Sequence, residues 1–309
     1  MGLIQQGIVV HGGAGGSIRD QDGCQAAAQL GADILANGGS ALHAVVQAVK
    51  QLEDDGRYNA GYGSVMFLDS SVDTLSVEMD AAVMDSRGIL GAVTCLSTIR
   101  NPVLVALAVT DTPHWLLAGE GAEHFAQTRG FEARQGPSPQ ALKKRDILIA
   151  ELKSGTAELK YSTAEAATKD KDTNWNYSIS REEAVKSFGS GTVGAVAIDS
   201  SGLFAVATST GGCAPSLWGR VGDTPIIGCG YFAGPMGAIA VTGVGEYIVP
   251  RLLARSIYEA AVSKQNMKQA IEDAIADFPS DIDLGIIGIS TTEIVMKSNR
   301  EMPCAEVRK

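Results

Sequence analysis

A glycine and a threonine, Gly191-Thr192, stand where the character of the sequence changes abruptly. The residues before them are polar and charged, whereas 193–199 have the apolar composition of a buried strand. A threonine hydroxyl is a poor nucleophile unless a base lies beside it, and an N-terminal threonine can use its own α-amine, whose ordinary pKa is about 7.7–8.0. Thr192 is internal, so its hydroxyl would first have to attack the Gly191 carbonyl and form an ester that water opens. From this dipeptide alone, a plain strand start is the more common interpretation.

Arg220 and Asp223 form a second pattern with chemical potential. A buried arginine can hold a carboxylate by two parallel hydrogen bonds, and a nearby carboxylate can hold an ammonium group. Together they would recognise the head group of a free α-amino acid and leave an aspartyl side-chain amide pointing elsewhere. Without further context, a surface Arg-Asp pair is the more common alternative.

His11 follows a short apolar strand and precedes several glycines. A general base is one possible role, but glycines that need a tight turn favour a structural role in holding this loop near the nucleophile. The glycines do not complete a GxGxxG motif, because Ile18 stands where the last glycine should be, and no P-loop lysine follows. Nucleotide binding is therefore poorly supported.

The composition is that of an ordinary globular protein. Of 309 residues, 45% are hydrophobic and 19% charged, which is enough apolar material for a large core. The net charge of -10 argues against a nucleic-acid or anionic-membrane partner. Five scattered cysteines without a CxxC pair predict free thiols, and four histidines without metal-ligand spacing argue against a transition-metal enzyme. Without an apolar run of membrane-spanning length or a signal-peptide pattern, we expect a cytoplasmic protein.

Hydrophobic periodicity predicts the elements that must position these residues. Their order indicates packed layers with antiparallel sheets, rather than a βαβ repeat. The polar composition of 154–190 predicts a mobile linker or a loosely held surface segment. The expected strands are 8–10, 76–84, 90–96, 192–199, 203–209, 237–242, 284–290 and 292–297, and the expected helices are 21–36, 40–53, 102–110, 116–129, 140–153, 246–263 and 266–277.

Several short motifs occur in a fixed order along nearly the whole chain outside 154–190. They are His11-Gly12-Gly13-Ala14-Gly15, Leu52-Glu53-Asp54-Asp55, Asn59-Ala60-Gly61-Tyr62-Gly63-Ser64, Glu78-Met79-Asp80-Ala81, Asn101-Pro102, Gly191-Thr192-Val193-Gly194, Thr208-Ser209-Thr210-Gly211-Gly212, Gly219-Arg220-Val221-Gly222-Asp223 and Thr242-Gly243-Val244-Gly245-Glu246. With this set the chain resembles the plant-type N-terminal-nucleophile asparaginases, also called isoaspartyl aminopeptidases. Each motif is weak alone, but the set is highly specific.

The resemblance implies an α+β protein with a four-layer αββα sandwich. It implies one domain, 1–309, that cuts itself into an α chain (1–191) and a β chain (192–309), with two such pairs assembled together. It also implies a structural sodium ion and no cofactor for catalysis. The implied sodium ligands are the main-chain carbonyls of Leu52, Glu53, Asp55, Tyr58, Ala60 and Tyr62.

The resemblance also assigns roles in the active site. It implies Thr192 as nucleophile and base. The remaining assignments are Thr210 beside the nucleophile, Asn59 approaching it, Thr242 and Gly243 at the oxyanion hole, and Arg220, Asp223 and Gly245 on the substrate head group.

The implied activity is hydrolysis of the side-chain amide of L-asparagine and of β-aspartyl dipeptides through a threonine acyl-enzyme. A glycosylasparaginase usually has Asp before its threonine, where Gly191 stands here, and a threonine aspartase normally has Ser at the position of Thr210. Both remain alternatives, as does a non-catalytic or nucleotide-binding relative. Departures from the family pattern at 66–74, 213–218 and 231–235 are expected to reshape the mouth of the pocket.

Overall fold

The computed structural model describes residues 3–68, 75–153, 191–214 and 216–309. The predicted linker 154–190 lies outside these residues, as does most of the 66–74 departure. The helices are α1 (Gln21–Ala36), α2 (Ala41–Asp55), α3 (Pro102–Val109), α4 (Gly119–Thr128), α5 (Pro139–Lys153), α7 (Gly245–Ile248), α8 (Leu253–Lys264) and α9 (Met267–Ala276). The strands are β1 (Gly7–His11), β2 (Phe67–Leu68), β3 (Leu75–Ser76), β4 (Met79–Asp85), β5 (Leu90–Leu96), β6 (Leu116–Ala118), β7 (Val193–Ile198), β8 (Phe204–Thr210), β9 (Tyr231–Gly234), β10 (Gly237–Gly243), β11 (Leu284–Ile289), β12 (Ile294–Ser298) and β13 (Cys304–Arg308).

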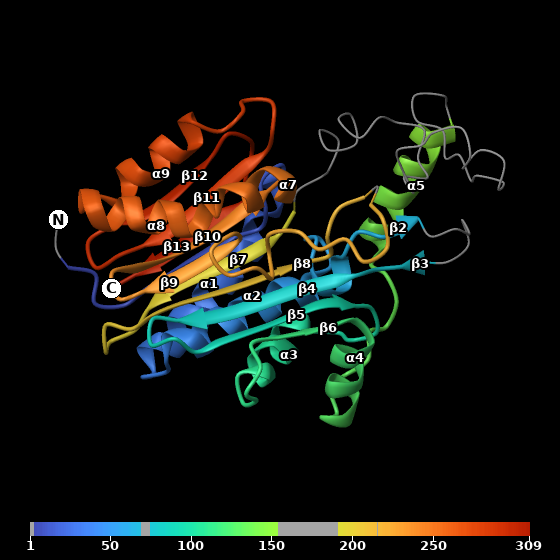
Figure 1. Cartoon of the computed structure of the whole chain (residues 1–309), viewed down its shortest axis with the longest axis horizontal. Coiled ribbons are helices and arrows are strands. Elements are labelled where there is room, and N and C mark those ends of the chain that lie inside the picture. The colour runs from blue at the N-terminus through green and yellow to red at the C-terminus, as the bar shows by residue number, and fades with distance from the viewer. Residues whose placement is uncertain (1–2, 69–74, 154–190, 215) are drawn as a thin grey trace.

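Two main sheets organise the described part of the chain (Figure 1). The larger has the order β13-β1-β7-β8-β4-β5-β6, and the smaller has the order β12-β11-β10-β9. Neighbouring strands are antiparallel except β5 and β6, which are parallel. The chain is therefore a mixed α+β protein whose sheets are mainly antiparallel, as the order of elements predicts.

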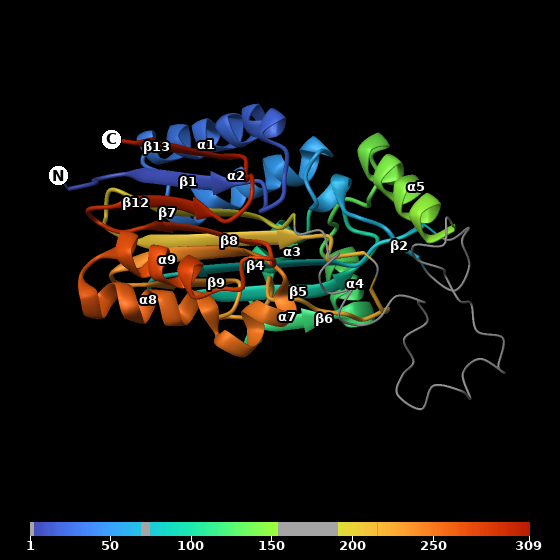
Figure 2. The ribbon, with the colours of Figure 1, turned by 90° about the horizontal axis from the view of Figure 1, so that it is seen from above.

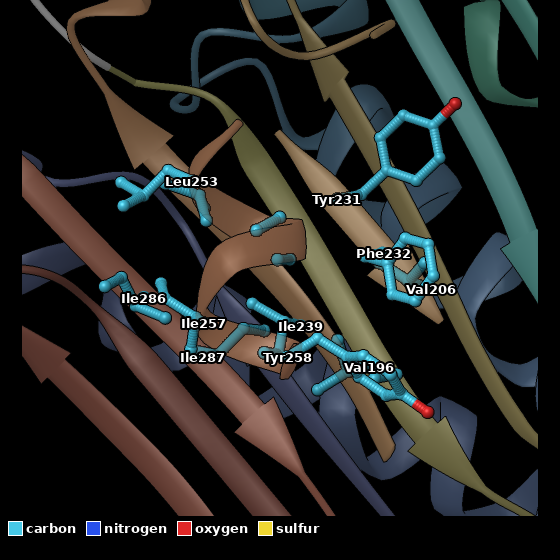
Figure 3. Packing of buried hydrophobic residues seen from close by; sticks show 14 of the residues in the cluster. Val196, Val206, Tyr231, Phe232, Ile239, Leu253, Ile257, Tyr258, Ile286 and Ile287 are labelled. Carbon is cyan, nitrogen blue, oxygen red and sulfur yellow. The ribbon is translucent and has the colours of Figure 1, made fainter. Parts of the chain in front are cut away.

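The central strands of the larger sheet are buried on both faces. Val196 and Val206 pack with Ile239 in one core, whereas Ala195 and Ala207 belong to a second core with residues of α1 and α2. Figure 3 shows Val196 near Ile239, and Val206 next to Phe232. Burial on both faces explains why these strands are continuous apolar runs rather than alternating ones.

Helices cover the outer faces of these sheets. The helices α1 and α2 contact β1, β7 and β8, while α8 and α9 contact strands of the smaller sheet (Figure 2). Strand β10 contacts both β7 and β8. Local signals fix the ends of α2, because the Ser40 hydroxyl accepts the His43 N–H at 3.2 Å and Gly56 has a left-handed φ of 77°.

Three expectations about elements are wrong. The helix predicted over 246–263 is interrupted, because Pro250 lies in a 3₁₀ turn and Leu252 has a φ of 45° before α8 begins. The helix predicted over 116–129 begins only at Gly119, since 116–118 form β6 and pair with β5. The short strands β9 and β13 were not expected, and β13 pairs with β1 at the edge of the larger sheet.

All five cysteines are free thiols, in agreement with their scattered spacing. Among the described residues, no helix combines the length and apolar character that crossing a membrane requires.

Candidate active site

A small pocket opens at the start of β7. It brings together the two residues just before β7, the end of β8, the loop that follows β8 and the end of β10. The pocket thus unites most of the predicted catalytic and substrate-binding positions, which lie far apart in the sequence. Its lining residues are Gly191, Thr192, Thr210, Gly212, Cys213, Arg220, Gly222, Asp223, Thr224, Gly243 and Val244.

The Gly191-Thr192 junction is packed too tightly for a larger residue at position 191. A Cβ on Gly191 would lie 2.6 Å from the Asn59 Cβ. A Cβ on Gly13 would lie 2.6 Å from the Gly191 Cα, and Gly13 also has a φ of 103°. The HGGAG loop, the Asn59 loop and the junction therefore meet through backbone and small residues.

Asn59 lies beside this junction with its amide fixed by main-chain groups. Its Nδ2 donates to the Gly212 carbonyl at 2.7 Å, and its Oδ1 accepts the Val65 N–H at 2.8 Å. Asn59 is buried, so these bonds hold the loop after β8 against Gly191.

The hydroxyl of Thr192 meets the hydroxyl of Thr224 at an Oγ1···Oγ1 distance of 3.2 Å. Both side chains are buried, Thr192 at 5% exposure and Thr224 at 1%. The predicted neighbour Thr210 lines the same pocket, but its Oγ1 accepts the Gly212 N–H at 3.1 Å. Thr224 is the residue that the sequence analysis missed, although it directly follows Asp223 in the substrate motif.

Arg220, which lines the same pocket, is engaged by an acidic side chain. Its Nε and Nη2 donate to the two carboxylate oxygens of Glu246 at 3.0 and 2.8 Å. Its Nη1 faces Gly222, where a Cβ would lie only 2.7 Å away. A carboxylate that approaches Arg220 would therefore have to compete with Glu246 for the guanidinium. The sequence analysis did not predict this pairing.

Asp223 is buried at 3% exposure, and its Oδ2 has no hydrogen-bond partner among the described residues. Burial raises the pKa of Asp223 to about 7, and the positive charge of Arg220 opposes this rise. A Cβ on Gly245 would lie 3.0 Å from the Arg220 Nη2 and 3.1 Å from the Asp223 Oδ1, so Gly245 keeps space between the two groups. An unpaired buried carboxylate oxygen is a natural acceptor for an ammonium group.

Two further carboxyl groups, those of Asp80 and Glu78, lie near Arg220. Asp80 accepts the Cys95 N–H at 3.0 Å, and Glu78 accepts the Gly219 N–H at 2.7 Å. Burial raises the pKa of Asp80 to about 7, while Arg220 lowers it. The excess of carboxyl groups over the guanidinium of Arg220 favours a ligand that brings its own positive charge.

Thr242 and Gly243 lie at the end of β10, near the pocket. Gly243 lines it, and a Cβ there would lie 2.4 Å from the Asp283 carbonyl. Thr242 is fully buried, and its Oγ1 accepts the Ala14 N–H at 3.4 Å. Thr242 therefore joins the HGGAG loop to β10.

His11 is fully buried at the end of β1. Burial lowers the pKa of His11 to about 3, and the neighbouring Thr192 backbone offsets this only in part. The ring is therefore neutral at ordinary pH. It packs against Gly194, where a Cβ would lie 2.5 Å from the Nε2.

The last turn of α2 and the loop after it carry the carbonyls expected to bind sodium. No cluster of three or more His, Cys, Asp and Glu side chains suited to a metal occurs in the described ranges. A Cβ on Gly61, whose φ is 52°, would lie 2.7 Å from the Glu53 carbonyl oxygen, so the loop curls back tightly onto α2. The carbonyls of Tyr58, Ala60 and Tyr62 each accept one backbone N–H. Each retains a second lone pair, and such hard oxygen donors fit a sodium ion.

The side chain of Glu53 ties this loop to β8. Its Oε1 accepts the Ser209 hydroxyl at 2.6 Å and the Val103 N–H at 3.0 Å, and its Oε2 accepts the Asn101 Nδ2 at 3.1 Å. Burial raises the pKa of Glu53 to about 8. The carboxyl group thus joins α2, the start of α3 and the residue before Thr210.

Comparisons with known proteins agree with the motifs. A family model described as Asparaginase matches residues 4–309. The chain is 39% identical over 257 residues to the isoaspartyl peptidase/L-asparaginase of Rattus norvegicus, covering 80% of this chain and 68% of that protein. It is 39% identical over 264 residues to the isoaspartyl peptidase of Escherichia coli K12, covering 81% and 75%. It is 38% identical over 257 residues to the isoaspartyl peptidase/L-asparaginase of Homo sapiens, covering 80% and 74%.

Proposed function

The chain belongs to the asparaginase family, and from that premise we propose that it is a self-processing amidohydrolase of L-asparagine and β-aspartyl dipeptides. One observation carries the proposal: a threonine after a crowded glycine shares a single pocket with Arg220 and the unpaired oxygen of Asp223. A nucleophile and a site for an amino-acid head group are the two parts that this reaction needs.

Maturation begins at the junction. The Thr192 hydroxyl attacks the Gly191 carbonyl, the peptide nitrogen leaves as the new α-amine, and water hydrolyses the ester that remains. The crowding of Gly191 by Asn59 and Gly13 supports this step, because it restricts the scissile peptide and excludes a side chain.

In the matured enzyme the α-amine of Thr192 accepts the hydroxyl proton as Oγ1 attacks the side-chain carbonyl of the substrate. Donors at Thr242 and Gly243 stabilise the tetrahedral oxyanion, an effect typically worth about 3–4 kcal/mol per donor. Ammonia or an amino acid leaves with the proton, and water releases aspartate from the threonine ester. Arg220 holds the substrate α-carboxylate, while Asp223 and Gly245 hold its ammonium group.

Three structural features complete the proposal. The two sheets form the inner layers of an αββα sandwich, which the contacts of α1, α2, α8 and α9 with their strands support. The cleaved α and β chains remain together, and two such pairs assemble. The carbonyls in the last turn of α2 and in the loop after it would hold a sodium ion, which would stabilise this loop and perform no chemistry.

The direct test is to measure aspartate release from L-asparagine and from β-Asp-Leu, with α-Asp-Leu as the control substrate. We expect hydrolysis of the first two and none of the third, since only a β-linked carbonyl reaches Thr192 from a head group held at Arg220. Absence of hydrolysis of both by a fully cleaved protein would overturn the proposal.

A further inference from the structure

We propose that Thr224 is a positioning residue that fixes the Thr192 hydroxyl for attack. The proposal rests on the proposed function of Thr192 as nucleophile. The observation that motivates it is the 3.2 Å contact between the two hydroxyl oxygens. No motif singled out Thr224, and the resemblance assigns it no role.

Burial makes this contact consequential. At 1% exposure the Thr224 hydroxyl cannot turn to bulk water, so its hydrogen-bonding capacity must be met inside the protein. Thr192 is β-branched and has few rotamers, and a hydrogen bond to a fixed partner selects one of them. Thr224 thus limits the directions in which the Thr192 Oγ1 can face.

Thr224 is itself held in place. Its carbonyl accepts the Thr208 hydroxyl at 3.1 Å, and Thr208 is fully buried on β8. The neighbouring Asp223 carbonyl accepts the N–H groups of Ile226 and Gly230 at 3.0 and 3.1 Å. Thr192 is therefore connected to β8 through the hydroxyl and the carbonyl of Thr224 and the hydroxyl of Thr208.

The position of Thr224 next to Asp223 adds a second consequence. Both residues line the pocket, one facing the nucleophile and the other forming the proposed ammonium site. The peptide unit between Asp223 and Thr224 therefore sets the distance between the proposed ammonium site and the partner of the Thr192 hydroxyl. This arrangement suits a side-chain carbonyl at the β position, and a change of a fraction of an ångström is enough to lower the rate.

Thr224 acts through a hydrogen bond and takes no part in proton transfer. In the matured enzyme the Thr192 proton goes to the α-amine, while the Thr224 hydroxyl can donate to Oγ1 as it bonds to the substrate. In the uncut chain the same contact orients Oγ1 toward the Gly191 carbonyl. Loss of the Thr224 hydroxyl should therefore slow both reactions.

The test compares Thr224→Val, which keeps the shape but removes the hydroxyl, with Thr224→Ser, which keeps the hydroxyl. We expect Thr224→Val to slow self-cleavage and to lower kcat on β-Asp-Leu, per cleaved molecule, by about 10- to 100-fold with KM changed by less than about threefold. Thr224→Ser should remain within about fivefold of the unmodified protein. Thr110→Val is the matched control, because the Thr110 hydroxyl donates to the Leu107 carbonyl outside the pocket.

The proposal fails if Thr224→Val retains full kcat and cleavage rate, if Thr224→Ser is as impaired as Thr224→Val, or if only KM changes. If Thr224→Val unfolds at a much lower temperature than the control, Thr208→Val provides the test instead. We expect Thr208→Val to lower kcat by less than Thr224→Val does. An unchanged kcat in Thr208→Val would contradict the proposal. An inactive unmodified protein would instead refute the proposed function itself.

Discussion

Two groups of residues line the pocket and differ in charge and in construction. We call them its hydroxyl end and its charged end. The hydroxyl end, with Thr192 and Thr224, is neutral and rests on β7 and β8 in the core. The charged end, with Arg220, Asp223 and Glu246, is built from the loop after β8 and the start of α7. This difference indicates a division of work, in which a rigid sheet holds the attacking atom and loops recognise the substrate.

The two ends should also differ in their response to pH. The pKa values of Asp80 and Asp223 are both raised to about 7 by burial. At the hydroxyl end, the proposed cleavage would add one titrating group, the α-amine of Thr192. Substitutions at the charged end are therefore expected to change binding and its pH dependence, whereas those at the hydroxyl end change turnover.

The largest expected effect at the charged end comes from Arg220→Met. Loss of a charged hydrogen-bonding partner for the substrate carboxylate should lower kcat/KM by about 10²- to 10³-fold, mainly through KM, while self-cleavage continues. Steady-state kinetics on β-Asp-Leu and a denaturing gel measure the two effects. Arg255→Met, which removes an exposed partner of Glu259, is the control. If Arg220→Met blocked cleavage but not binding, the division between the two ends would be wrong.

A smaller effect concerns Asp223 and pH. Its raised pKa means that the group is protonated below about pH 7 and cannot hold an ammonium ion by charge. We expect KM to rise up to about tenfold per pH unit as the pH falls below 7, and Asp223→Asn to have a high KM that depends less on pH. A KM that stays constant in the unmodified enzyme between pH 5.5 and 8 would contradict this role.

The smallest expected effect on activity, but a measurable one on stability, comes from Glu53→Gln. The folded-state pKa of Glu53 is raised from 4.5 to about 8. The contribution of this carboxyl group to the free energy of unfolding is therefore complete below about pH 4.5 and is lost as the pH rises toward 8. The free energy of unfolding should fall by roughly 1–3 kcal/mol across this window, and less in Glu53→Gln. Thermal unfolding at pH 5.5 and 8 in a Thr192→Ala background tests this with one uncut chain. The exposed Glu132→Gln is the control, and equal slopes in all variants would refute the role of Glu53.

Local signals predicted most of the scaffold. The helical periodicity of α2 and the apolar runs of β7 and β8 are properties of neighbouring residues, and the structure confirms these elements. Strand β6 could not be found in this way, because Leu116 and Leu117 become a strand by pairing with β5. The break at Pro250 has a signal in the sequence, the proline itself, but the helical periodicity on both sides of it favours one continuous helix.

The site divides in the same manner. Thr192, Arg220 and Asp223 could be predicted because their residue types and motif order indicate a specific chemistry, and the structure places them in one pocket. The contact between Arg220 and Glu246 joins residues 26 positions apart and depends on how the loop meets α7. A lone threonine after Asp223 has no chemical signature, so the partner of the nucleophile became visible only through the fold.

The central claim is that Thr192 cuts the chain before itself and then acts as the nucleophile. Intact-mass spectrometry of the unmodified protein and of Thr192→Ala, combined with β-Asp-Leu hydrolysis, tests it most directly. The account predicts two fragments divided between Gly191 and Thr192 with activity, and for the variant a single inactive chain near 32.1 kDa. A variant that is still cut at this bond, or an unmodified chain that hydrolyses the dipeptide while uncut, would contradict it.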